Sequence, residues 1–132
     1  MLGEMIGENR GKRTSRRVLS TSPLRVETMF EDSGKIFGND CNQIVTYWAE
    51  MRPDGSLYGE GHAVLILQNG EIATWKGAGV GTIHPGGTVS YRGAVYYSTS
   101  SPTLARLNAV AGVFEYEVDV NGNTHSKVWE WK

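Results

Sequence analysis

Turn sequences at regular intervals constrain the fold of this chain more than any other feature. Proline fixes φ at about −65°, and Asn-Gly favours the positive φ of a two-residue hairpin turn. Such sequences recur four times in the last two-thirds of the chain, as Arg52-Pro53-Asp54-Gly55-Ser56, Gln68-Asn69-Gly70-Glu71, His84-Pro85-Gly86-Gly87 and Val120-Asn121-Gly122-Asn123. The intervals between them leave room for strands of about 10 to 13 residues, longer than the usual five or six. The spacing therefore predicts consecutive antiparallel hairpins.

Side chains between these turns alternate with a period of two, which is typical of strands and not of helices. Many of the alternating residues are β-branched or aromatic, as strands prefer. The pattern covers residues 56–67, 71–83, 88–99, 109–120 and 124–132, and extended segments are also expected at 12–20, 24–37 and 41–51. Asp32-Ser33-Gly34 is either a turn or a bulge inside the second of these. The alternation leaves open which face of each strand points inward.

About eight long strands in meander order would leave exposed edges in an open sheet, and closure into a barrel removes them. We therefore predict an all-β fold, an up-and-down antiparallel barrel of about eight strands, in a single domain over 1–132. Residues 1–11 are expected to form an irregular N-terminal arm. One short helical turn is expected at 102–108, where Ser101 is a candidate N-cap and Pro102 occupies the first helical position.

Glycine is unusually frequent, with 17 in 132 residues, about twice the average usage. Six glycines fall inside the predicted strands, at Gly59, Gly61, Gly77, Gly79, Gly81 and Gly93. A glycine inside a strand permits a sharp bend or the close approach of another backbone or a large ring. The glycines therefore indicate a strongly curved sheet.

The charge balance excludes several classes of protein. The formal net charge is −1, so the chain lacks the positive field that non-specific nucleic-acid binding requires. A locally basic segment between Arg10 and Arg25 is interpreted as a solvated edge strand. Cys41 is the single cysteine, which fits a reducing compartment. No apolar run reaches the length of a signal peptide or of a membrane span, so we expect a soluble cytoplasmic protein without a membrane partner.

Several segments, read together, resemble a known group of proteins. They are Val45-Thr46-Tyr47-Trp48, the stretch from Arg52 to Gly61, Trp75-Lys76-Gly77-Ala78-Gly79-Val80-Gly81, Tyr91-Arg92-Gly93-Ala94-Val95-Tyr96-Tyr97 and Leu104-Ala105-Arg106-Leu107-Asn108. The chain resembles a small uncharacterised prokaryotic family whose calycin-like barrels are similar to allene oxide cyclase. The resemblance implies an eight-stranded barrel with an apolar cavity, in a dimer or trimer. No cyclase motif matches, so the resemblance supplies no catalytic residue.

Eight side chains are candidates for binding a ligand in the barrel: Tyr58, Glu60, His62, Trp75, Arg92, Tyr96, Arg106 and Glu115. Glu60 and His62 share one strand face, so a carboxylate and an imidazole could act as a general acid–base pair. Residues two apart on a strand are common by chance, and a structural role is the competing interpretation. Trp75 is one of the aromatic residues that would fill space beside the glycines.

The two arginines among these candidates each have two interpretations. Arg92 would hold a carboxylate in a barrel mouth, or form an outward ion pair with Glu60 or Glu71. Arg106 would hold an anionic group at one opening, or tie the helical turn to the strand ends. Glu115 and Glu117 share a face at a separation of about 7 Å, within the range used in glycoside hydrolysis, although such pairs usually face solvent.

No metal or cofactor is expected. His62, His84 and His125 lack metal-binding spacing. The glycines of 77–81 lie within a strand and not at the strand–helix junction that phosphate binding needs. Three functions remain open: binding of a small apolar or amphipathic molecule inside the barrel, a cyclase or isomerase acting on a confined substrate, and a non-catalytic oligomeric protein.

Overall fold

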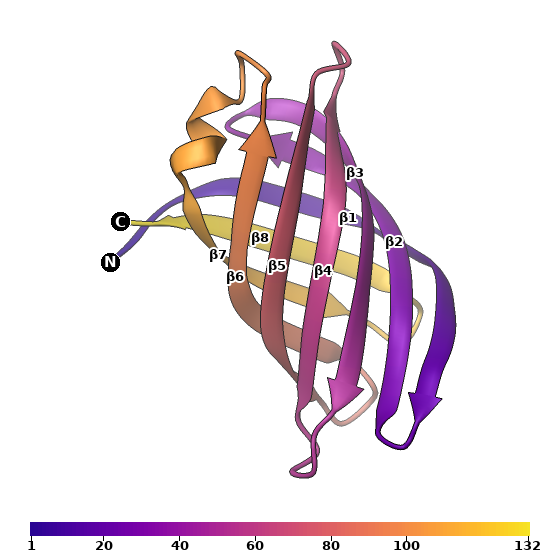
Figure 1. Cartoon of the computed structure of the whole chain (residues 1–132). Coiled ribbons are helices and arrows are strands. Elements are labelled where there is room, and N and C mark those ends of the chain that lie inside the picture. The colour runs from indigo at the N-terminus through magenta and orange to yellow at the C-terminus, as the bar shows by residue number, and fades with distance from the viewer.

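The computed structural model describes residues 1–132 and is a closed barrel of eight antiparallel strands in sequence order (Figure 1). The strands are β1 (Leu2–Thr21), β2 (Leu24–Ile36), β3 (Asn39–Met51), β4 (Leu57–Leu67), β5 (Ile72–Ile83), β6 (Val89–Thr99), β7 (Ala111–Val118) and β8 (Asn123–Trp131). One 3-10 helix, η1 (Ala105–Ala109), lies between β6 and β7. It overlaps the helical turn predicted at 102–108 but begins at Ala105, after the predicted first residue Pro102, and Leu104 and not Ser101 stands at its N-cap. The predicted all-β, eight-stranded up-and-down barrel is confirmed. No helix has the length and apolar character needed to cross a membrane.

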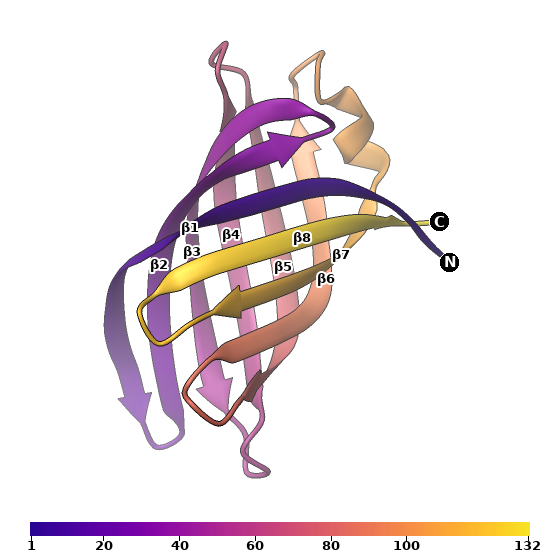
Figure 2. The same cartoon turned by 180° about the vertical axis from the view of Figure 1, so that it is seen from behind.

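The N-terminal segment differs from the prediction, because residues 1–11 are not irregular. β1 begins at Leu2 and pairs with β8 as far as the Lys12–Asn123 contact. Figure 2 shows these two strands side by side, with the N- and C-termini adjacent. A barrel closes only if its first and last strands form hydrogen bonds with each other. Residues 2–12 of β1 form these hydrogen bonds with β8. From Arg13 to Thr21, β1 pairs with β2 alone.

The Asp32-Ser33-Gly34 step is neither a turn nor a bulge. β2 runs straight through it, and its register with β3 has no shift. A Cβ on Gly34 would lie 2.0 Å from the carbonyl oxygen of Glu8 on β1. Glycine is therefore required here because the two backbones approach closely, and Asp32 keeps its place in the strand alternation.

The strands are strongly staggered around the barrel. Following paired residues from Val26 through all eight strands returns to β2 at Ile36, not at Val26. Such stagger goes with tilted strands and a wider interior. Neighbouring backbones also approach each other closely in this barrel. A Cβ on Gly93, for example, would lie 2.0 Å from the carbonyl oxygen of Ala78, so only glycine fits there. All six glycines singled out in the sequence lie on the inward face of β4, β5 or β6.

Two groups of buried side chains fill the barrel. At the end covered by η1, the plug cluster consists of Ile6, Ile36, Cys41, Leu65, Leu67, Ala73, Leu104, Leu107 and Val110. The aromatic cluster consists of Phe30, Val45, Leu57, Ala63, Tyr91, Tyr116 and Val118. The single cysteine, Cys41, thus lies in a packed core. The candidate site lies among the inward side chains of the aromatic cluster and its neighbours.

Candidate functional site

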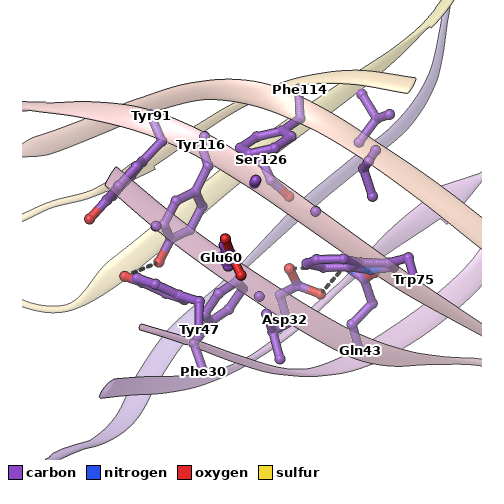
Figure 3. Close-up of a pocket in the computed structure, with 18 of the residues that line it drawn as sticks. Phe30, Asp32, Gln43, Tyr47, Glu60, Trp75, Tyr91, Phe114, Tyr116 and Ser126 are labelled. Carbon is purple, nitrogen blue, oxygen red and sulfur yellow. Dashed lines mark hydrogen bonds between the residues drawn. The ribbon is translucent and has the colours of Figure 1, made fainter. Parts of the chain in front are cut away.

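A cavity of about 90 Å³ lies inside the barrel (Figure 3). Seven aromatic side chains from five strands line it: Phe30, Tyr47, Trp75, Tyr91, Tyr97, Phe114 and Tyr116. The remaining inward side chains of its wall are Asp32, Gln43, Val45, Val95, Ser126 and Val128. The volume exceeds the space that one water molecule needs, and it is smaller than the roughly 150 Å³ of an engineered cavity that binds benzene.

Glycine explains why this part of the barrel is not filled. Gly59 and Gly61 on β4 face Gly79 and Gly77 on β5, and all four belong to the cavity wall. A Cβ on Gly79 would lie 2.9 Å from the carbonyl oxygen of Arg92 and 3.0 Å from Cζ of Phe114. The strands come too close to carry side chains here, and the rings opposite do not reach across the whole interior.

A network of polar side chains crosses one wall of the cavity. Asn9 donates a hydrogen bond to Oδ1 of Asp32 at 2.9 Å, and Gln43 donates to the same oxygen at 3.0 Å and to Oδ2 at 3.3 Å. Trp75 donates its indole N–H to Oε1 of Gln43 at 2.7 Å. Asn9, Asp32 and Gln43 are each less than 10% exposed. Neutral amides therefore supply every protein hydrogen bond to the Asp32 carboxyl.

The environment of Asp32 makes ionisation of its carboxyl less favourable than in water. Burial raises the pKa of this carboxyl above the usual aspartate value, and the hydrogen bonds from Asn9 and Gln43 offset the shift only in part. The carboxyl forms no ion pair. A buried acid with a raised pKa beside a cavity is a group that can exchange a proton or bind a cation.

A second polar feature of the cavity is a cluster of tyrosines. The hydroxyls of Tyr47 and Tyr116 are hydrogen-bonded at 3.2 Å. The Tyr91 ring lies 5.9 Å from that of Tyr47 and 5.8 Å from that of Tyr116. Burial raises the pKa of all three phenols, so they remain neutral and act as hydrogen-bond donors and acceptors. Figure 3 shows these tyrosines at one side of the cavity and Trp75, Asp32 and Gln43 at the other.

Of the eight side chains selected from the sequence, Trp75 alone points into the cavity. Glu60 belongs to the cavity wall because it lies between Gly59 and Gly61. Its side chain is exposed outside the barrel, where the carboxylate accepts a hydrogen bond from the Tyr58 hydroxyl at 2.7 Å. The guanidinium of Arg52 covers the outer face of the Tyr58 ring, 4.7 Å from its centroid. His62 is also exposed, opposite Thr46 and Lys76.

The pair formed by Arg92 and Glu115 lies on the outer surface. Nε of Arg92 lies 3.6 Å from Oε2 of Glu115, and the two side chains are 60% and 46% exposed. Arg92 therefore forms an outward ion pair, which was one of the two interpretations given from the sequence. Its partner is Glu115 and not Glu60 or Glu71. Tyr96 is exposed as well. None of the three lies inside the barrel.

Arg106 ties η1 to the strand ends. It forms ion pairs with Glu4 at 3.1 Å and Glu130 at 2.6 Å, and its guanidinium lies 4.6 Å from the centre of the Phe37 ring. This arrangement corresponds to the structural alternative considered for Arg106. No group of three histidine, cysteine, aspartate or glutamate side chains is placed to hold a metal ion.

The sequence reasoning missed Asn9, Asp32, Gln43 and Tyr116. A signal for Asp32 was present, because Thr28, Phe30, Asp32, Gly34 and Ile36 alternate along β2 and place an acid on an otherwise apolar or small face. Gln43 likewise follows Cys41 and precedes Val45 on the inward face of β3. A polar residue that interrupts an apolar alternation is the pattern that would have identified both.

Comparisons with known proteins extend the description of the fold. No protein-family model matches this chain, and no curated protein sequence matches it. Several solved structures are similar to it. A conserved protein of unknown function from Rhodopseudomonas palustris has a TM-score of 0.82 and 11% identity, with 98% of this chain and 97% of that chain covered. A protein of unknown function from Clostridium acetobutylicum has a TM-score of 0.83 and 12% identity, with 96% of each chain covered.

The third structure is a beta-barrel like protein from Acinetobacter baumannii, with a TM-score of 0.82 and 11% identity, covering 100% of this chain and 96% of that chain. Identities this low show a shared fold and do not transfer a function. The chain is therefore similar over its whole length to uncharacterised prokaryotic β-barrel proteins.

Proposed function

We propose that this protein binds a small organic molecule in the cavity between Asp32 and the tyrosine cluster. The observation that carries the proposal is the combination of an aromatic wall with a few polar groups that converge on the same space. Ligand sites in proteins are typically concave and mostly apolar, with a small number of placed polar groups. The resemblance to allene oxide cyclase barrels agrees with a cavity of this kind and stays a prediction.

The experiment blocks the cavity from one strand and leaves the opposite face as a control. Ser126 faces Tyr116 and Asn9 across its neighbouring strands, so S126M sends a long side chain into the cavity. The adjacent Lys127 has the opposite orientation, so K127M changes the outer surface of the same strand. The probe is tert-butanol, and the readout is the NMR signal of the Trp75 indole N–H.

We expect a saturable shift of the Trp75 signal in the unmodified protein and in K127M, and none in S126M. Saturation in S126M with unchanged affinity would mean that the probe binds elsewhere. A linear drift in all three proteins would contradict the proposal.

A second candidate function is an enzyme of the cyclase or isomerase type, and Asp32 is the observation that favours it. A buried carboxyl with a raised pKa beside phenol hydroxyls can serve as a general acid or base towards a confined substrate. The test is to incubate a molecule extracted from the purified protein with fresh protein in D₂O. Rearrangement or deuterium uptake that D32N lacks would support catalysis, and an unchanged molecule would support binding alone.

Self-association is a third candidate, favoured by the edge of β1 between Arg13 and Thr21. This edge has no strand beside it within one chain, and such an edge can pair with another copy. Light scattering after size-exclusion chromatography tests it. A dimer or trimer would support this role, and a monomer at all concentrations would contradict it.

A further inference from the structure

The charges around the cavity are unbalanced. Asp32 is the only carboxyl that points into the cavity, and no lysine, arginine or histidine belongs to the cavity wall. Its hydrogen bonds come from the neutral amides of Asn9 and Gln43. Isolating a carboxylate from water without a positive partner is costly, and a cation brought to it reduces that cost.

The aromatic wall favours the same kind of ligand. The face of an aromatic ring is electronegative and attracts cations, most strongly for tryptophan. Trp75, Tyr97 and Phe114 line the cavity on the strands facing β2 and β3. The indole N–H of Trp75 already donates a hydrogen bond to Gln43. A ligand would therefore contact the ring of Trp75 and not its N–H group.

The volume restricts the ligand to a compact group. About 90 Å³ is less than the roughly 150 Å³ of the engineered cavity that binds benzene. An ammonium with three or four methyl groups has fewer non-hydrogen atoms than benzene, so its size is close to the limit of this space. Recognition of alkylated ammonium groups by aromatic side chains is an established use of the cation–π interaction.

From these observations we propose that the ligand of the cavity is a small organic cation, an alkylated ammonium held between the Asp32 carboxylate and the aromatic rings. This inference rests on the proposed function, since it names the chemical class of molecule that the same cavity binds. Arg13 and Arg16 influence the hydroxyl of Tyr47 from β1, on the tyrosine side, and do not belong to the cavity wall.

The test compares three probes of similar shape and different charge: tetramethylammonium chloride, tert-butanol and sodium pivalate. Each is titrated into the full-length protein at constant chloride and ionic strength, with the Trp75 indole N–H as the readout. We expect tetramethylammonium to bind about tenfold more tightly than tert-butanol, and pivalate to bind most weakly. In D32N, the preference for the cation over the alcohol should fall several-fold, and the attraction of the aromatic rings should account for the preference that remains.

The outcomes separate this inference from the proposed function. If tert-butanol or pivalate binds the unmodified protein as tightly as tetramethylammonium, and S126M abolishes that binding, the cavity binds ligands but the cation assignment is wrong. If no probe binds, both proposals fail. If the cation preference is undiminished in D32N, the carboxylate is not its source. The comparison within the unmodified protein decides the question even if D32N does not fold.

Discussion

The plug cluster and the aromatic cluster fill the same barrel in different ways. At the η1 end, aliphatic side chains from the strands meet Leu104 and Leu107, both 0% exposed, and the interior is closed. In the aromatic cluster, rings such as Phe30 and Tyr116 stack at 5.0 Å between centroids but leave a cavity beside them. Branched aliphatic chains interdigitate and fill irregular space, whereas flat rings opposite glycines do not.

The two regions also differ in how they treat polar groups. The plug cluster contains only apolar side chains and the thiol of Cys41. The cavity borders a buried carboxyl, the amide of Gln43 and a pair of hydrogen-bonded phenols. We therefore assign a stabilising role to the plug cluster and a ligand-binding role to the polar, partly empty cavity. The following substitutions test this division, beginning with the largest expected effect.

Opening the plug should be the most destabilising change. L107A removes a fully buried side chain and leaves a void in tightly packed surroundings. We expect the free energy of unfolding, measured by urea denaturation, to fall by about 2–5 kcal/mol. The control is I72A at a side chain that is 50% exposed, which should cost much less. Equal losses for the two variants would show that the η1 end is not the packed part of the barrel.

Removing a hydroxyl beside the cavity should have a smaller effect. Y116F deletes the hydrogen bond to Tyr47 and keeps the ring that stacks on Phe30. We expect a loss of about 0.5–1.5 kcal/mol in the free energy of unfolding. The control is Y96F on the exposed side of β6, which should leave stability unchanged. A loss above the value for L107A would contradict the division between a stabilising plug and a hollow aromatic region.

The pH dependence of stability should reveal Asp32. Its folded pKa is raised, so between the ordinary value of 3.8 and the folded value the unfolded chain binds fewer protons than the folded one. The contribution of Asp32 to stability therefore falls as pH increases through this interval. We expect the melting temperature of the unmodified protein, relative to D32N, to decrease as pH rises from about 3.8. A relative increase over the same interval would show that the carboxyl is stabilised in its ionised form.

The candidate site was much less predictable from the sequence than the barrel. Selection of charged residues within strands favoured side chains such as His62, Arg92 and Glu115, and these face water, because unpaired charges are costly to bury. Asp32 was overlooked because the neighbouring Ser33 and Gly34 suggested a turn. The buried polar residues are few, and each is tolerated because the others satisfy its hydrogen bonds.

The sequence by itself determined the strands from residue 12 onward, their order and the four turns in the last two-thirds of the chain. These depend on local chemistry, namely the positive φ available to glycine in the Asn-Gly turns and the alternation of side chains between them. The tertiary structure decided which face of each strand is inside, and that the strand at residues 2–12 closes the barrel. It also brought Asn9, Asp32, Gln43 and Trp75 together from four strands. That meeting depends on the stagger around the closed sheet, a property of all eight strands at once that no single segment encodes.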